Sequence, residues 1–295
     1  MAMPSPSRFK TLMKLPGLGR LQDFSPRDAL MRRIVTPEIE ALVARMPKRT
    51  GSYGYDAWGY DERMVKVGVG LVRLLYERYF RVVANGLEHV PSTGRALVIG
   101  NHSGQLPMDG VLVGYALLTN PHGPRAARAM IERFFPTVPF LGNLLNGLGA
   151  VIGDPLNCAK MLDAEETIIV FPEGVRGSGK PYSKRYQLQR FGNGFVHLAM
   201  AHDTPIIPVG IVGCEETMPS LGSIDPLARL LGIPYVPIVP TLVPLPARVV
   251  LNFGAPIRFA NDARSETEVE ARVEQVKDAI RDLVDKGLAE RTSIY

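Results

Sequence analysis

The feature that most constrains this chain is an alternation of short apolar runs with helical patterns, which begins near residue 86. Apolar runs of strand length occupy Ala96–Gly100, Thr167–Phe171 and Pro205–Val212, and helical segments separate them. Such an alternation is typical of a sheet covered by helices. We therefore expect an α/β fold in which a mixed β-sheet is flanked by helices, preceded by an N-terminal helical segment.

Further elements complete this expected fold. We expect a fourth strand over Arg248–Phe253 and helices over 109–118, around 158–165, over 194–202 and from Ser265 onward. Ser265 and Glu268 have the spacing of a capping box, which marks the start of the C-terminal helix. Pro205 and Pro208 lie in one apolar run. Because proline lacks an N–H group, they favour a strand at the edge of the sheet or at an entry point.

The N-terminal part has a different character. Residues 1–60 are rich in Pro, Gly and Arg and predict short helices joined by loops, with one helix over Pro37–Arg45. Asp61–Ala84 predicts one long helix with basic residues between its apolar positions. It is either a core helix with a basic outer face or an interfacial helix lying on lipid. We divide the chain into a basic N-terminal segment, 1–60, and a main domain, 61–295, that includes the long helix.

Positive charge is concentrated in the N-terminal third. Residues 1–85 hold fifteen Lys or Arg against eight Asp or Glu, a net +7, while the remainder holds nineteen against twenty-one, a net −2. Such a segment can meet phosphates of nucleic acid or of anionic lipid, although a solvated surface is the common alternative. No stretch of about 18 uncharged apolar residues occurs, so we expect no membrane-spanning helix.

The loop after the first strand carries a histidine and an acidic residue. It reads NHSGQLPMD from Asn101 to Asp109. An aspartate that folds back onto one ring nitrogen of His102 fixes the tautomer and makes the other nitrogen a better base. Taken by itself, such a pair is more often a structural hydrogen bond than a catalytic one.

The loop after the second strand is rich in glycine and charge. It reads FPEGVRGSGK from Phe171 to Lys180. Arg176 and Lys180 suit a phosphate, and the glycines allow a ligand to approach the backbone closely. An ordinary charged turn is the alternative interpretation of this segment alone.

Together with Ile206–Val209, these loops resemble in order and spacing the sequence blocks of the glycerolipid acyltransferase family, which acylates glycerol phosphate, lysophosphatidate and related acceptors. Arg133–Gly153 occupies the place of the second block, with a looser match. The resemblance covers roughly residues 70–290. The run over 184–194 and the residues over 213–216 are similar to a bacterial branch akin to diacylglycerol-acyltransferase-like proteins.

The resemblance implies a role for each matching residue. His102 and Asp109 are the expected catalytic pair, in which His102 takes a proton from an acceptor hydroxyl while that oxygen attacks a thioester carbonyl. Backbone N–H groups near Gly104 or in the following helix are expected to stabilise the oxyanion. Glu173 is expected to accept a hydrogen bond from the acceptor. The residues expected to bind substrate are Asn101, Gly104, Arg133, Glu173, Gly174, Arg176 and Lys180.

This implied activity needs no metal and no cofactor. The expected donor is acyl-CoA or an acylated carrier protein, and the leading expected acceptor is 1-acylglycerol-3-phosphate. A neutral mono- or diacylglycerol is the alternative acceptor, because Val175 replaces the threonine usual in the family's block. We expect the chain to lie peripherally on the cytoplasmic face of a membrane and to bind no nucleic acid.

The sequence departs from the family pattern at the catalytic pair, and other functions stay open. Six residues separate His102 from Asp109, where the family usually has four, so the loop between them must bulge. A hydrolase would use Ser103, Ser178 or Ser183 with His102, but no Gly-x-Ser-x-Gly motif supports it. A non-catalytic lipid-binding module would tolerate the loss of His102, whereas an enzyme would not.

Overall fold

The structure, a computed structural model, describes residues 26–46, 51, 55–137 and 140–295. Within this part, one seven-stranded sheet has the strand order β1-β7-β6-β2-β5-β3-β4. All neighbouring strands are parallel except β6 and β7, which are antiparallel, so the expected mixed sheet is confirmed. The strands are β1 (Val83–Asn85), β2 (Ala96–Gly100), β3 (Ala127–Ile131), β4 (Val151–Ile152), β5 (Thr167–Val170), β6 (Ile206–Val212) and β7 (Val250–Phe253).

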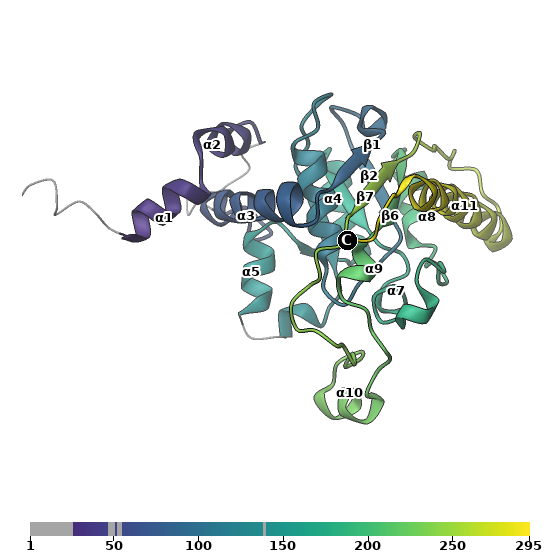
Figure 1. Ribbon diagram of the computed structural model, residues 1–295. Coiled ribbons are helices and arrows are strands. Elements are labelled where there is room, and N and C mark those ends of the chain that lie inside the picture. The colour runs from purple at the N-terminus through teal and green to yellow at the C-terminus, as the bar shows by residue number, and fades with distance from the viewer. Residues whose placement is uncertain (1–25, 47–50, 52–54, 138–139) are drawn as a thin grey trace, which may run out of the picture.

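Helices cover the sheet and also extend beyond it, as Figure 1 shows. They are α1 (Pro26–Ile34), α2 (Pro37–Ala44), α3 (Glu62–Leu74), α4 (Met108–Leu118), α5 (Leu141–Gly147), α6 (Pro155–Asp163), α7 (Val175–Ser178), α8 (Gly194–Ala201), α9 (Cys214–Thr217), α10 (Asp225–Leu231) and α11 (Glu266–Glu290). Single turns of other helix types cover Leu75–Tyr79, Leu87–His89, Phe135–Thr137 and Tyr182–Lys184.

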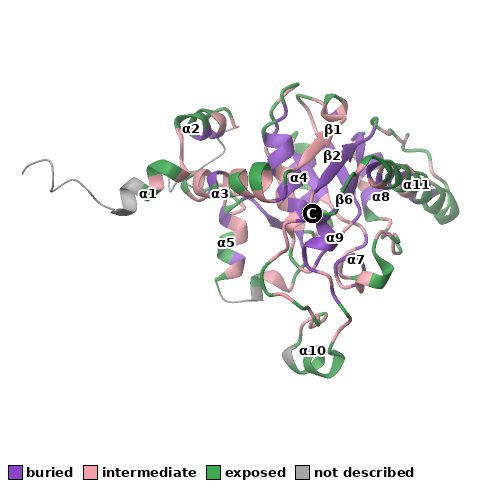
Figure 2. Ribbon diagram, in the orientation of Figure 1, coloured by how far each residue is buried: buried purple, intermediate pink, exposed green. Residues whose placement is uncertain are grey.

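The two faces of the sheet pack against different helices because successive side chains of a strand point to opposite faces. In β2, Leu97 and Ile99 join a core cluster with α6, α8 and α11. Val98, between them, joins a second cluster with α4. In Figure 2 the strands at the centre are coloured as buried, while the outer surface of α11 is exposed. Burial on both faces explains why β2 and β6 read as continuous apolar runs rather than alternating ones.

The expected long helix over 61–84 is confirmed as far as Tyr79 and is wrong beyond that residue. Asp61 caps α3 by accepting hydrogen bonds from the N–H groups of Arg63 and Met64. The helix passes through a π-helical turn at Leu75–Tyr79 and then ends. Arg81 has a φ of +46°, which ends the helical path, and the chain enters β1 beside β7.

The expected edge position of the proline-containing strand is also wrong, since β6 lies between β2 and β7 near the middle of the sheet. Pro208 fits there because pairing with the β7 side changes register around it. Val209 pairs with Phe253, whereas the bridge before it joins Ile206 to Ile257. Between these two pairs, β6 advances by three residues and the opposite segment by four. The extra residue makes a β-bulge, and at a bulge a sheet tolerates the missing N–H group of proline.

Two helices lie outside the sheet layers at the N-terminal side. α1 and α2 pack on α3, and a small cluster of Ile39, Val43 and Val65 holds α2 and α3 together. The expected helix near residue 37 is therefore present. Residues 1–25, and residues 47–50 and 52–54 of an expected loop over 47–60, lie outside the described residues. The proposed division at residue 60 stays a prediction.

The strands β1, β3 and β4 are additions to the four strands expected from the sequence. At the other end of the chain, Ser265 caps α11 as expected, and its side chain accepts a hydrogen bond from the N–H group of Glu268. None of the described helices has both the length and the apolar character needed to cross a bilayer.

Candidate active site

Both motif loops follow neighbouring strands. The loop with His102 follows β2, and the loop with Glu173 follows β5, which pairs with β2 in parallel. Because parallel strands end at the same edge of a sheet, the two loops meet. The N–H group of His102 donates to Glu173 Oε1 at 2.9 Å, which joins the loops directly.

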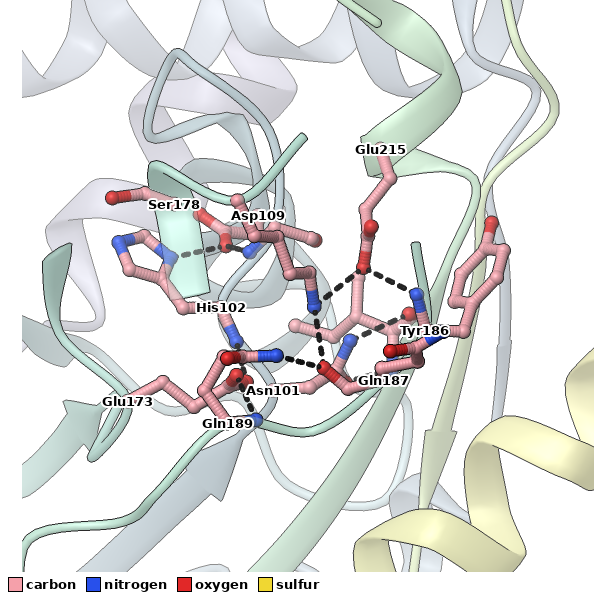
Figure 3. A network of polar contacts seen from close by, with 12 residues as sticks. Asn101, His102, Asp109, Glu173, Ser178, Tyr186, Gln187, Gln189 and Glu215 are labelled. Carbon is pink, nitrogen blue, oxygen red and sulfur yellow. Dashed lines mark hydrogen bonds and ion pairs between the residues drawn. The ribbon is translucent and has the colours of Figure 1, made fainter. Parts of the chain in front are cut away.

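The expected contact between His102 and Asp109 is present. His102 Nδ1 lies 2.6 Å from Asp109 Oδ2, as Figure 3 shows. Asp109 is fully buried in the first turn of α4, and its carboxylate also accepts from the N–H groups of Ser103 and Gly110 at 2.9 and 2.7 Å. These bonds hold the carboxylate in place, so that Nδ1 carries the proton and Nε2 is left with a free lone pair.

The histidine ring is held from a second direction. It stacks on Phe171 with ring centroids 4.7 Å apart and an interplanar angle of 12°. The imidazole is 16% exposed, so water reaches only part of it. Phe171 ends the strand run before the glycine-rich loop, and its aromatic character is the sequence signal for this contact.

Glycine at position 177 allows the second loop to lie against the histidine. A Cβ atom there would come within 2.9 Å of His102 Cβ and 2.8 Å of Glu173 Cβ. The sequence shows a glycine-rich turn but does not show which glycine is required. The structure assigns that role to Gly177 of α7.

An apolar cavity of about 430 Å³ opens beside the histidine. The α3, α4 and α5 helices, with β3, supply most of its wall, and His102, Phe171 and Gly174 line it near the motif loops. Its apolar lining includes Val65, Val69, Val72, Val111, Leu118, Met130, Phe135, Leu145, Leu148 and Ile169. A polar base thus faces a space suited to a hydrocarbon chain.

Two residues expected to bind substrate are held in the protein interior instead. Asn101 is fully buried, and its amide both donates to Ile211 O at 2.9 Å and accepts from Ile211 N at 2.7 Å. Lys180 is also buried, with its Nζ 3.0 Å from Glu215 Oε1 and 3.3 Å from Gln187 O. These are corrections: Asn101 ties the catalytic loop to β6, and Lys180 is engaged by a buried carboxylate.

Glu173 also has a different role from the expected one. It is 1% exposed, and its second carboxylate oxygen accepts from the N–H group of Gln189 at 2.7 Å. Both carboxylate oxygens of Glu173 therefore accept hydrogen bonds from backbone N–H groups, so Glu173 positions the loops rather than an acceptor hydroxyl.

Burial raises the pKa of the neighbouring Glu215 to about 7, although Lys180 opposes that shift.

Gly104 shapes the catalytic loop but does not line the cavity. Its φ of +84° belongs to the left-handed region, and a Cβ atom there would lie 3.0 Å from Cys214 O. The N–H groups of His102 and Ser103, the two residues before Gly104, already donate to carboxylates. These two N–H groups are therefore engaged within the protein, and the expected oxyanion site near Gly104 or in the following helix stays a prediction.

Of the three other expected binding residues, Arg133 and Gly174 line the cavity, whereas Arg176 does not. Arg133 lines the cavity with a largely exposed side chain, and its Nη2 lies 2.7 Å from Asp154 Oδ2. Arg176 is exposed on α7 and donates to Arg190 O at 3.2 Å. Gly174, with a φ of +55°, lines the cavity where a Cβ atom would meet Glu132 Oε1 at 2.8 Å.

The charge around His102 predicts a pH dependence. Burial lowers the pKa of its imidazole, but the charge and hydrogen bond of Asp109, assisted by Glu173 and Glu132, raise the pKa above the usual value. A general base must be unprotonated to accept a proton. Activity is therefore expected to fall as the pH drops through this pKa, which is raised from the usual imidazole value of ~6.5. In Asp109→Asn the acid limb should move to lower pH and the maximal rate should fall ~10²-fold. The measurement is kcat/KM against pH; an unmoved limb in Asp109→Asn would contradict the pairing.

Comparisons with known proteins agree with this geometry. The family model described as "Acyltransferase" matches residues 81–212. An uncharacterised protein of Mycobacterium leprae is 35% identical over 260 residues, which cover 83% of this chain and 71% of that protein. A Bos taurus protein named "DGAT1/2-independent enzyme synthesizing storage lipids" is 27% identical over 204 residues, or 68% of this chain and 58% of the relative.

A solved structure shares the fold. The crystal structure of the 1-acyl-sn-glycerophosphate acyltransferase PlsC from Thermotoga maritima matches with a TM-score of 0.54 at 18% identity, over 90% of this chain and 94% of that one. The chain belongs to the acyltransferase family, and its fold is the one seen in that enzyme.

Proposed function

We propose that this acyltransferase moves a fatty acyl group from a thioester to a hydroxyl of a glycerolipid. The observation that carries the proposal is the position of His102, which is held by Asp109 and faces an apolar cavity. A hydrocarbon chain fits the cavity, and the free ring nitrogen suits proton abstraction from an alcohol. The names of the bovine relative and of the Thermotoga maritima enzyme support a lipid acceptor.

The transfer proceeds in a single enzyme-bound complex. His102 Nε2 takes the proton as the acceptor oxygen attacks the thioester carbonyl, and Asp109 stabilises the resulting imidazolium. The tetrahedral intermediate then collapses: its C–S bond breaks, and the leaving thiolate takes the proton from Nε2. The thioester is already activated, so the reaction requires no nucleophilic serine. Across the described residues, His102 makes no hydrogen bond to a serine side chain.

The donor in this proposal is acyl-CoA or an acylated carrier protein, and the acceptor is 1-acylglycerol-3-phosphate. Arg133 at the cavity and Arg176 on α7 are exposed cations that suit its phosphate. A neutral mono- or diacylglycerol is the second candidate. It is favoured by the burial of Lys180 against Glu215 and by the storage-lipid name of the bovine relative.

An acceptor panel tests the proposal and separates these candidates. The purified chain is given a labelled acyl thioester with glycerol phosphate, lysophosphatidate, monoacylglycerol or diacylglycerol. Lysophosphatidate is expected to give the fastest ester formation. If no glycerolipid is acylated at a rate above the blank, the proposal is wrong.

Arg176→Ala is expected to raise the KM for a phosphorylated acceptor. A charge-assisted hydrogen bond contributes ~1.5–3 kcal/mol, or roughly 10–150-fold in KM. Arg185→Ala, which removes a cation stacked on Tyr182, serves as the charge-matched control. An unchanged KM in Arg176→Ala, together with equal use of monoacylglycerol, would move the assignment to the neutral acceptor.

We also propose that the chain works peripherally on the cytoplasmic face of a membrane. The support is chemical, because both the acceptor and the product are lipids. The net +7 over residues 1–85 favours an anionic surface. Two of these cations already have partners in the protein: Lys66 Nζ lies 2.8 Å from Glu62 Oε1, and Arg81 donates a hydrogen bond to Pro246 O.

A further inference from the structure

A long connection between α9 and β7 projects from the body of the molecule. We call residues 219–246 the apolar arm; it includes α10, which lies at the bottom of Figure 1, away from the sheet. The arm has no place in the acyltransferase geometry described above. In Figure 2, much of α10 is coloured as exposed.

Large aliphatic side chains cover the arm. Leu242 is 90% exposed and Leu230 is 81% exposed, values typical of charged surface residues rather than of leucine. Other exposed aliphatic residues of the arm are Leu221, Ile224, Leu227, Ile238 and Val243. Such a concentration on one projection marks an interaction surface rather than the scattered apolar residues of an ordinary surface.

The arm is almost free of charge. Its charged residues are Asp225 and Arg229, one of each sign, and it holds seven prolines among 28 residues. A surface that binds a protein usually has a polar rim with hydrogen-bonding groups, and a surface that binds nucleic acid carries cationic side chains. An aliphatic projection with so few charges suits the hydrocarbon region of a lipid layer instead.

The arm keeps a defined shape and is attached near the catalytic loops. Backbone hydrogen bonds join Leu221 N to Ile238 O and Ile224 N to Val236 O, both at 2.8 Å. At its base, Tyr182 N donates to Ser220 O at 2.8 Å. Tyr235 packs so closely on α7 that a Cβ atom at Gly179 would lie 2.9 Å from its ring. The helix that packs on His102 is therefore also in contact with the arm.

We infer that the apolar arm inserts its aliphatic side chains into the hydrocarbon boundary of a lipid bilayer. This inference rests on the proposed function, in which the acceptor and product are lipids. An arm anchored beside α7 places the site next to the surface that holds the acceptor. Because insertion buries apolar surface, it resists salt, unlike contacts made by the basic N-terminal segment.

The test is flotation of the full chain with phosphatidylcholine vesicles, which carry no net charge, at low and high salt. Leu230→Asp and Leu242→Asp are each expected to weaken the partition coefficient about tenfold or more, the scale of burying one leucine. Leu156→Asp is the matched control, because Leu156 is 61% exposed on α6 and should leave partition within twofold. High salt should leave parent binding largely unchanged.

Several results would overturn the inference: parent protein that stays unbound, or arm variants that bind like the parent. An arm that instead joins two copies of the chain would give a parent dimer that these substitutions dissociate, with vesicle binding unaltered. Activity on a water-soluble short-chain lysophosphatidate is measured in parallel and should be the same in parent and variants. Arm-dependent vesicle binding without any acyl transfer by the parent would retain the inference and reject the proposed function.

Discussion

His102→Ala is expected to lower the rate of acyl transfer by ~10²–10⁴-fold, the usual contribution of general-base catalysis. The variant should fold normally, because the ring is partly exposed and its loop is also held by the backbone bond from residue 102 to Glu173. The measurement is turnover of a labelled thioester with the best acceptor, together with a thermal unfolding curve.

The chain offers a matched control for this experiment. His202 also lies beside an aspartate, with its Nδ1 2.9 Å from Asp163 Oδ1, and its side chain is 17% exposed against 16% for His102. It does not line the apolar cavity. His202→Ala should therefore retain parental turnover. Turnover of His102→Ala within threefold of the parent would remove His102 from the mechanism and favour a lipid-binding module.

Gly177→Ala is expected to reduce turnover by ~10²-fold or more without removing any catalytic group. The new methyl group would lie 2.9 Å from His102 Cβ and 3.0 Å from His102 O, so α7 and the catalytic loop must separate. A displacement of about 1 Å at a reacting group can lower a rate ~10²-fold. Forcing a methyl group into packed structure also costs ~1–3 kcal/mol of stability.

Gly194→Ala is the control for this substitution. Gly194 begins α8, and a Cβ atom there would meet nothing within 4 Å. The Gly194→Ala variant should keep the turnover of the parent. Its stability should equal or exceed that of the parent, because alanine favours a helix more than glycine does. Parental activity in Gly177→Ala would show that the contact between α7 and His102 is unimportant for the chemistry.

The main parts of the site could be predicted from the sequence, because the apolar pattern of the strands and their order in the sheet bring the same loops together. The apolar runs at β2 and β5 were recognisable because both faces of the sheet are buried. Once those strands are parallel neighbours, the loops with His102 and Glu173 must lie together. The pairing of His102 with Asp109 followed from the chemistry of a histidine near a carboxylate, even with two extra residues in the loop.

The sequence could not predict which partners the polar side chains of the loops would find. Lys180 was expected to bind phosphate, but its partner Glu215 comes from α9, 35 positions further along the chain. Asn101 likewise bonds to Ile211 across the sheet. The end of the helical path after Tyr79 depends on the left-handed backbone of Arg81, which helix periodicity does not reveal.

Direct transfer assisted by His102 is tested by following the protein and the product in one experiment. The purified chain is mixed with an acyl-CoA, first alone and then with lysophosphatidate, and intact-protein and lipid mass spectra are recorded over time. Direct transfer assisted by His102 predicts an unmodified protein mass throughout and a new ester only after the acceptor is added. A stable acyl adduct on the protein that disappears when the acceptor is added, or ester formation that persists at the parental rate in His102→Ala, would contradict the account.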